Sequence, residues 1–146
     1  MSEAERDRVA AAALGWLRTP YHRNARVKGH GVDCAMLPAA VYEEAGVISH
    51  IEPEYPSDWH LHRSEELYLG WIDRVGGAEI EVHQARKGDF LVWRFGRTFS
   101  HGAIVLAPPQ IVHAFAEAGM VTLDSWTDLE ELARRPMKAF TFWGRG

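Results

Sequence analysis

Residues 29–37 read Gly-His-Gly-Val-Asp-Cys-Ala-Met-Leu and hold Cys34, the only cysteine of the chain. Glycine-rich, polar sequence gives way here to an apolar run over residues 35–42, which is typical of a helix. We expect this helix to span about residues 33–44 and to stop at Gly46. The thiol therefore lies at a junction between a loop and a helix, next to the carboxylate of Asp33.

The position of Cys34 favours a reactive thiol. The N-terminus of a helix offers N–H groups without helical partners and a partial positive charge, and both lower the pKa of a cysteine placed there. The N–H of Cys34 could also donate to an oxyanion. Asp33 could cap the helix, although its charge opposes ionisation of the thiol. The alternative is a cysteine that serves as a small buried hydrophobic residue.

The composition indicates one globular domain over residues 1–146. Hydrophobic residues make up 47% of the chain and charged residues 25%, which are ordinary values. A net charge of −4 and a pI near 6.0 argue against binding to nucleic acid. No apolar run reaches the roughly 20 residues of a membrane helix. The sequence shows no secretory signal and only one cysteine, so we expect synthesis in a reducing cytoplasm.

Helical patterns come first along the chain, and strand patterns follow after Gly77. Apolar residues recur at helical spacing before Thr19-Pro20, and they include Val9, Ala13 and Trp16. A third helix is expected over residues 63–75. Five strands are expected over residues 90–93, 101–106, 111–115, 121–123 and 139–143. This order predicts an α+β domain, with N-terminal helices packed on a C-terminal antiparallel sheet of about five strands.

Two histidines in the predicted sheet could supply the base that a cysteine nucleophile needs. His101 begins one expected strand, and His113 lies in the next. A three-residue loop over residues 107–109 would pair Ala103 with His113 and set both imidazoles on one face. A loop one residue longer would put them on opposite faces. The alternative is two unrelated histidines in a sheet.

Several short motifs, taken in their order, resemble the NlpC family. They are Thr-Pro-Tyr at 19–21, Val-Asp-Cys at 32–34, Lys-Gly-Asp-Phe-Leu-Val-Trp at 87–93, Ser-His-Gly-Ala-Ile-Val at 100–105 and Ile-Val-His-Ala at 111–114. The members of that family are bacterial papain-like cysteine peptidases that cut the peptide stems of peptidoglycan. The resemblance implies a papain-like fold and a hydrolase that needs no metal or organic cofactor.

The same resemblance implies a role for each site residue. Cys34 is the nucleophile, His101 the base and His113 the residue that orients His101. Tyr21, Asp33 and Ser100 are the implied substrate-binding residues, with Tyr21 near the thiol and Asp33 holding the amine of a stem peptide. The implied scissile bond joins γ-D-glutamate to the diamino acid.

The chain departs from the usual family pattern in three places. Ala35-Met36 replaces Ser-Gly after the cysteine, Arg23-Asn24-Ala25 replaces Trp-Gly-Gly, and Lys87 stands where proline is common. These departures affect the residues that set specificity, and they leave the three catalytic positions intact.

Residues 33–37 and 58–63 resemble the branch of the family that is encoded with phage tails and gene-transfer agents. That resemblance implies tail proteins as partners and a virion component that acts at the cell wall or periplasm. Two alternatives remain open: a structural tail-tip subunit with a vestigial peptidase fold, or a papain-like amidase or acyltransferase.

Two further features have simpler interpretations. His60 and His62 could form a metal pair with Cys34 or Asp58, but His-x-His alone supplies too few ligands, so we expect a polar loop and no metal. The basic loop residues Arg23, Arg26 and Lys28 are expected to be a solvated surface, although they could meet anionic wall polymers.

Overall fold

The computed structural model describes residues 2–48, 72 and 76–143. Its elements, in chain order, are α1 (Ser2–Leu14), β1 (Arg26–Val27), β2 (Gly31–Val32), α2 (Met36–Glu44), β3 (Ala78–Ile80), the short 3₁₀ helix η1 (Val82–Gln84), β4 (Phe90–Phe95), β5 (Thr98–Val105), β6 (Gln110–Phe115), β7 (Met120–Ser125), α5 (Glu130–Ala133) and β8 (Met137–Thr141). The third helix expected over residues 63–75 falls almost wholly outside the described residues.

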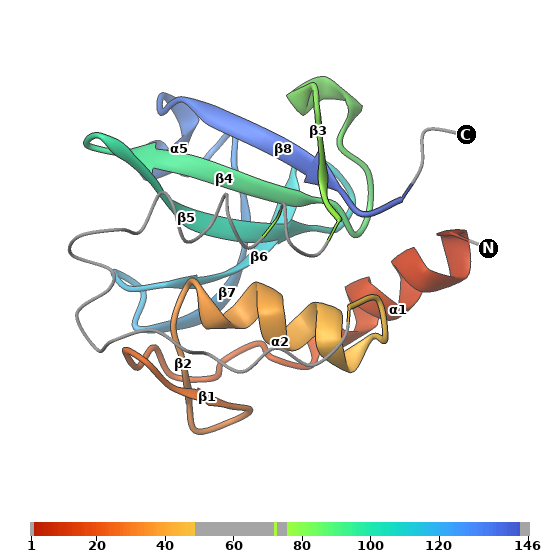
Figure 1. The fold of residues 1–146 in the computed structure, drawn as a ribbon. Helices are drawn as coiled ribbons and strands as arrows, with labels where there is room; N and C mark the ends of the chain where they lie inside the picture. The colour runs from red at the N-terminus through yellow and green to blue at the C-terminus, as the bar shows by residue number, and fades with distance from the viewer. Residues whose placement is uncertain (1, 49–71, 73–75, 144–146) are drawn as a thin grey trace.

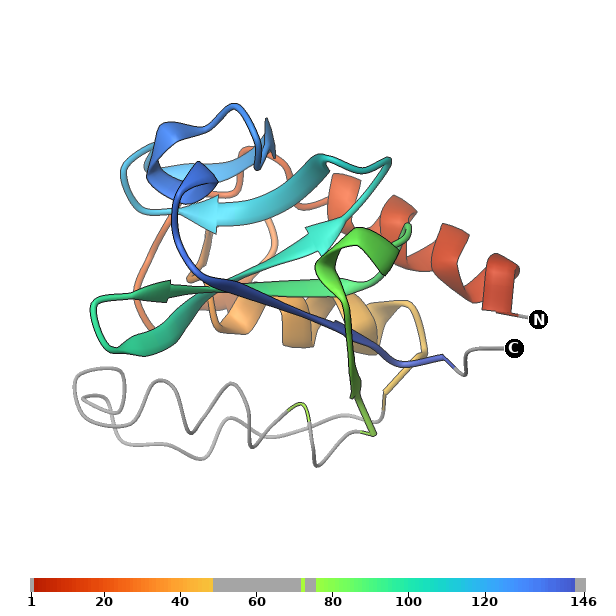
Figure 2. The ribbon, with the colours of Figure 1, turned by 90° about the horizontal axis from the view of Figure 1, so that it is seen from above.

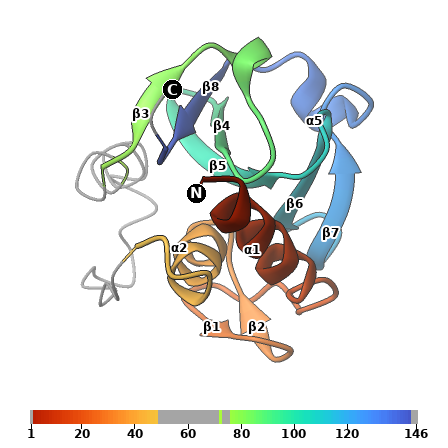
Figure 3. The ribbon, with the colours of Figure 1, turned by 90° about the vertical axis from the view of Figure 1, so that its right-hand side faces the viewer.

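The predicted α+β class is confirmed. Six strands of the described chain form one antiparallel sheet in the order β3-β8-β4-β5-β6-β7, and α1 and α2 lie together against one side of it (Figure 1). The sheet curves around these two helices (Figure 3). Viewed from above, α2 lies beneath β4 and β5 (Figure 2). The sequence predicts about five strands; the additional one is β3, whose three residues, Ala-Glu-Ile, are too few to show a strand pattern.

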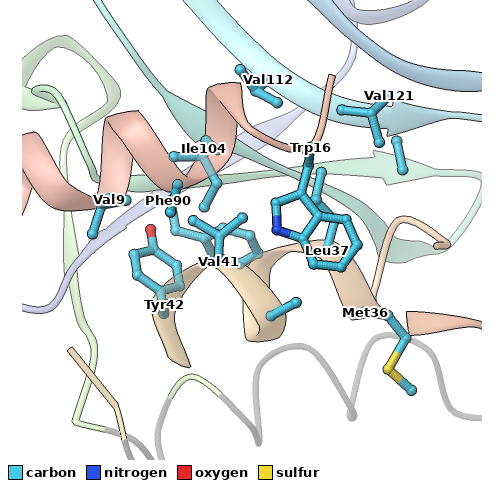
Figure 4. Packing of buried hydrophobic residues seen from close by; sticks show 14 of the residues in the cluster. Val9, Trp16, Met36, Leu37, Val41, Tyr42, Phe90, Ile104, Val112 and Val121 are labelled. Carbon is cyan, nitrogen blue, oxygen red and sulfur yellow. The ribbon is translucent and has the colours of Figure 1, made fainter. Parts of the chain in front are cut away.

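A hydrophobic core fills the space between the helices and the sheet. Figure 4 shows this cluster, which includes Val9, Trp16, Leu37, Val41, Tyr42, Phe90, Ile104 and Val112. Leu37 is fully buried, and full burial of a leucine side chain contributes about 1.5–3 kcal/mol to the stability of the fold. Alternate residues of β4, Leu91 and Trp93, face a second cluster on the other side of the sheet, where Leu132 of α5 covers them. Two-sided burial explains why β4 reads as an unbroken apolar run.

The first helix buries the face that the sequence predicts, because Val9, Ala13 and Trp16 are all in the core. Regular helix ends at Leu14, earlier than the predicted stop at Thr19-Pro20. The segment between is a series of tight turns that ends with Arg18 at a positive φ of 72°. Within the described part of the chain, no helix is long and apolar enough to span a membrane.

A buried ion pair joins α1 to the start of β4. The Arg6 guanidinium lies 3.0 Å from Asp89 Oδ1 and donates over 2.7 Å to the carbonyl of Lys87. The other oxygen of Asp89 accepts the backbone N–H of Arg86 at 2.8 Å. Arg6 is also stacked over the ring of Trp143, 4.4 Å from its centre. The helix is thereby held to the sheet by charge and by packing.

Candidate active site

Asp33 shapes the turn that carries Cys34 into α2. Its Oδ1 accepts the backbone N–H groups of Ala35 and Met36 at 3.0 and 2.8 Å, and its carbonyl accepts the N–H of Leu37. Its Oδ2 accepts the N–H of Asn24 at 2.7 Å. Asp33 thus closes the turn that leads into α2, whose N-cap position is Ala35, and regular helix begins at Met36, three residues later than predicted. The Asp33 carboxylate opposes the lowered thiol pKa expected from the sequence, which stays a prediction.

The loop before Cys34 is fixed on both sides by backbone hydrogen bonds. Val32 donates to the carbonyl of Pro20 at 3.1 Å and accepts the N–H of His22 at 3.0 Å. The N–H of Tyr21 donates to the carbonyl of Gly119, at the turn before β7, over 2.8 Å. Tyr21 and its two neighbours are therefore anchored to β2 and to the turn before β7, which directs the Tyr21 side chain at the thiol.

Two glycines allow this loop to fold tightly. Gly29 adopts a positive φ of 82°, which a residue with a side chain rarely adopts. At Gly31, an added Cβ would lie 2.9 Å from the Cβ of His22, so no larger residue fits without a shift.

The Cys34 thiol lies between Tyr21 and the strand that carries His101. The Tyr21 hydroxyl donates to Sγ over 3.8 Å, and Sγ lies 3.5 Å from the carbonyl oxygen of Ser100. His101 pairs with Trp93 and Phe99 pairs with Arg94, which leaves Ser100 as the extra residue of a β-bulge. Bulges recur beside active sites, because they redirect the strand and its side chains.

His101 and His113 face each other across β5 and β6. The strand pairs Ile104–Val112 and Val105–Ile111 have the register that the three-residue loop predicts, so this prediction is confirmed. The imidazoles are joined by a hydrogen bond of 2.8 Å between Nε2 of His101 and Nδ1 of His113. Both rings are buried, with relative exposures of 7% and 0%. Nδ1 is therefore the remaining nitrogen of His101.

Aromatic side chains surround this imidazole pair. The ring of His101 lies between 5.8 and 5.9 Å, centre to centre, from the rings of Phe95, Trp93 and Phe115. Phe115 also stacks on His113 at 5.0 Å with an interplanar angle of 18°. These contacts restrict ring rotation and exclude water, so the pair is held in one geometry.

Burial keeps the two imidazoles neutral near pH 7. It lowers the pKa of His101 to about 3, with a further contribution from the neighbouring His113. Burial also lowers the pKa of His113, and the hydrogen bond and charge of Asp124 oppose that shift only in part. Burial first, and then the charge of Cys34, raise the pKa of Tyr21, so its hydroxyl remains a donor. A neutral imidazole can accept a proton, which is what a general base requires.

Asp124 of β7 extends the pair and was missed by the sequence analysis. Its Oδ2 lies 2.7 Å from Nε2 of His113 and accepts the Thr122 hydroxyl over the same distance. Thr122 is directly opposite His113 in the β6–β7 ladder. A carboxylate within a strand pattern, on the same face as Thr122, was the available signal.

The structure thus brings five of the six predicted site residues into two linked groups. Tyr21, Cys34 and Ser100 meet at the thiol, and His101 and His113 form the imidazole pair. The sixth, Asp33, has both carboxylate oxygens occupied by backbone N–H groups. Its predicted contact with a substrate amine stays a prediction.

The basic loop is partly neutralised by α2. Arg26 forms an ion pair with Glu43, and Lys28 lies 2.8 Å from Glu44. Arg23 is exposed, as predicted for a solvated surface.

His60, His62 and Asp58 lie outside the described residues. Over residues 2–48, 72 and 76–143, no group of three or more His, Cys, Asp or Glu side chains is arranged to hold a metal ion. The expectation of a polar loop without metal stays a prediction.

Solved structures similar to this chain share its fold. The NlpC/p60 domain of the peptidoglycan hydrolase SagA aligns with a TM-score of 0.64 and 22% identity, over 91% of this chain and 96% of that one. NlpC1 from Trichomonas vaginalis aligns with a TM-score of 0.69 and 16% identity, over 98% of this chain and 45% of that one. This chain therefore spans less than half of the longer protein.

A third similar structure is RipD from Mycobacterium tuberculosis, described as a non-catalytic NlpC/p60 domain protein adapted to peptidoglycan binding. It aligns with a TM-score of 0.61 and 18% identity, over 95% of this chain and 98% of that one. No curated protein matches this chain in sequence. The model of the NlpC/P60 family matches residues 18–135, which include the thiol, the imidazole pair and Asp124. The chain belongs to the NlpC/P60 family.

Proposed function

We propose that this protein is a cysteine endopeptidase that cleaves the stem peptides of peptidoglycan, with Cys34 as nucleophile, His101 as general base and His113 as its orienting partner. The observation that carries the proposal is the buried, hydrogen-bonded pair of neutral imidazoles, next in sequence to the carbonyl that the thiol contacts. A paired imidazole beside a cysteine is the arrangement that activates a thiol nucleophile.

In the acylation step, Nδ1 of His101 takes the thiol proton as Sγ attacks the amide carbonyl. A bond between Sγ and the carbonyl carbon forms, and the carbonyl oxygen becomes an oxyanion that the backbone N–H of Cys34 binds. The Tyr21 hydroxyl stabilises the charge on sulfur until the bond forms. The C–N bond then breaks, and His101 gives its proton to the leaving amine.

In the deacylation step, water attacks the thioester. His101 removes one proton from this water, the C–S bond breaks, and the acyl group leaves as a carboxylic acid. The thiolate recovers its proton from His101, so the enzyme returns to its starting state. His113 keeps Nδ1 of His101 directed at the reacting atoms through both steps, the role that an aspartate or asparagine has in other triads.

The proposed substrate bond is the amide between γ-D-glutamate and the diamino acid. Ser100 and Tyr21 border the thiol and are the proposed contacts to the stem peptide, with Asp33 proposed to hold its free amine. No cofactor takes part in these steps. We also propose that the protein is made in the cytoplasm and reaches the wall with phage or gene-transfer-agent tail proteins.

A second candidate is a binding or structural subunit that has kept the fold without the reaction. The observation that supports this candidate is the similarity to RipD, which is described as a non-catalytic NlpC/p60 domain protein. The hydrogen-bonded pair of His101 and His113, next in sequence to the Ser100 carbonyl that the Cys34 thiol contacts, favours catalysis.

Product analysis tests the proposal. Purified peptidoglycan is incubated with the protein or with its Cys34→Ser variant, and the soluble products are identified by mass spectrometry. We expect stem fragments with a new amine on the diamino acid, and none from the variant. Cleavage between the sugar and the stem would indicate an amidase instead. Binding of both proteins to the wall without products would support the structural subunit.

A further inference from the structure

The far end of the imidazole pair is held by a carboxylate that the proposed reaction does not use. Nε2 of His113 lies 2.7 Å from Asp124 Oδ2. His113 is fully buried, whereas the side chain of Asp124 is 29% exposed at the outer strand β7. The chain of contacts therefore runs from Asp124 through His113 to His101 and ends at Nδ1.

We propose that Asp124 is a positioning residue that sets the tautomers of both imidazoles and leaves the lone pair of His101 on Nδ1. The effect of Asp124 on catalysis rests on the proposed function, whereas its effect on the two tautomers is independent of that function.

The argument follows the donors and acceptors along the chain. An ionised carboxylate has only acceptors, so Nε2 of His113 must carry the hydrogen of that ring. A neutral imidazole has a single N–H, so Nδ1 of His113 is an acceptor. The 2.8 Å bond then requires His101 to donate from Nε2. The lone pair of His101 is left on Nδ1, where a base is needed.

Without the carboxylate, a second arrangement satisfies the same bond equally well. Nδ1 of His113 would donate to Nε2 of His101, and the single hydrogen of His101 would sit on Nδ1. That nitrogen could then not accept the thiol proton. The geometry of the two rings alone does not choose between the two arrangements, and Asp124 does.

Asp124 has a second effect when His101 takes the thiol proton. A positive charge then enters a site from which aromatic rings exclude water, and charge without a partner is costly there. The negative charge of Asp124 offsets this cost, because Asp124 is hydrogen-bonded to His113 and His113 is hydrogen-bonded to the charged His101. Partial burial acts to raise the pKa of Asp124, but the hydrogen bonds from His113 and Thr122 outweigh it and lower that pKa, which keeps the carboxylate ionised.

Thr122 holds Asp124 in place. Its hydroxyl donates to the same Oδ2 that accepts from His113, over 2.7 Å. Thr122 and Asp124 lie on one face of β7 because they are two residues apart. Thr122→Val keeps the shape of the side chain and removes only this hydrogen bond.

The test compares Asp124→Asn with the wild type by nitrogen-15 NMR of the histidine rings at pH 7. Protonated and unprotonated ring nitrogens give well-separated signals, so the tautomers are read directly. We expect Nε2–H in both rings of the wild type. In Asp124→Asn, we expect Nδ1–H to appear in His113 and in His101. Asp128→Asn is the matched control, because Asp128 is an exposed carboxylate just after the same strand.

The kinetic expectation is a fall in kcat of about 10–10³-fold in Asp124→Asn, with KM little changed, since the residue acts through His113 and does not touch substrate. Thr122→Val should show a smaller loss of the same kind. In a His113→Gln background, Asp124→Asn should add almost no further loss, because the two positions act as a unit.

The outcomes separate this inference from the proposed function. Unchanged tautomers in Asp124→Asn, or Nδ1–H on His113 in the wild type, would overturn the inference even if the enzyme cleaves peptidoglycan. Changed tautomers in a protein that yields no products would support the positioning role and reject the peptidase. If Asp124→Asn does not fold, the wild-type spectrum and Thr122→Val still decide the matter.

Discussion

Two buried polar pairs, one between α1 and the start of β4 and one between β5 and β6, differ in charge. Arg6 and Asp89 are 4% and 1% exposed and carry opposite charges, which compensate each other across the contact between α1 and β4. His101 and His113 are just as buried, but burial holds both neutral. The first pair fixes two elements to each other. The second keeps a proton acceptor ready at neutral pH.

The difference shows that equally buried polar pairs can contribute either to stability or to catalysis. A buried charge is tolerated only when a partner and hydrogen bonds compensate it, and the compensation makes the pair unreactive. An imidazole avoids the cost of burial by losing its proton, and it is then able to accept one. Substitutions in the two pairs should therefore affect different quantities. Those in the Arg6–Asp89 pair should lower stability, and those in the His101–His113 pair should lower activity.

The largest expected effect is on activity, at His101. His101→Asn should lower kcat/KM by about 10⁴-fold or more, because asparagine can form a hydrogen bond but cannot carry a proton. The free energy of unfolding at pH 7 should change far less. Steady-state hydrolysis and urea unfolding of the same preparation measure both. An active His101→Asn variant would remove the base from the proposed reaction.

The next effect is at His113, which should tolerate a substitute that keeps a hydrogen bond. His113→Ala should lose on the order of 10²–10⁴ in kcat, whereas His113→Asn and His113→Gln should retain much of the activity. The comparison is made on kcat at saturating substrate. Equal rates for all three variants and the wild type would reduce the proposed triad to a pair of Cys34 and His101.

The stability effect belongs to the other pair. Arg6→Met leaves Asp89 charged and buried without its partner, and it should cost about 3–5 kcal/mol of unfolding free energy. Activity per folded molecule should stay at the wild-type level. Lys87→Met is the matched control, because Lys87 forms an exposed ion pair with Asp7, and such pairs contribute only about 0.2–1 kcal/mol. Equal losses in both variants would contradict the distinction between the buried and the exposed pair.

The sequence predicted the parts of this site that depend on local pattern. The spacing of Val9, Ala13 and Trp16 predicted the buried face of the first helix, and the odd-length loop predicted that His101 and His113 share a face. Both follow from helix and strand periodicity, which few residues suffice to reveal.

What the sequence did not predict depends on pairing between distant segments. Asp124 joins the site only because β7 pairs with β6 in a register that places Thr122 opposite His113. Arg6 and Asp89 are more than eighty positions apart, and no local pattern links them. The start of the second helix was misplaced because Asp33 uses its carboxylate to close the turn before Met36.

The last effect is a dependence of stability on pH, spread over several pH units, to which the neutral pair should contribute. In the unfolded chain both rings titrate near pH 6.5, whereas burial holds the native pKa of His101 at about 3 and also lowers that of His113. Below pH 6.5 the unfolded state therefore binds more protons than the native state, so the free energy of unfolding falls as the pH is lowered.

The fall should reach up to about 1.4 kcal/mol per pH unit for each ring, and the part due to His101 should end near pH 3, where the native ring takes up its proton. Urea unfolding at intervals between pH 7 and 4 measures the slope. The double variant His101→Gln, His113→Gln should make the slope shallower, since glutamine does not titrate. His22→Gln, at an exposed histidine in the loop before Cys34, should leave it unchanged. A wild-type curve as flat as that of the double variant would mean that the two rings take up protons at the same pH in the folded and the unfolded protein, so that burial does not lower their pKa values.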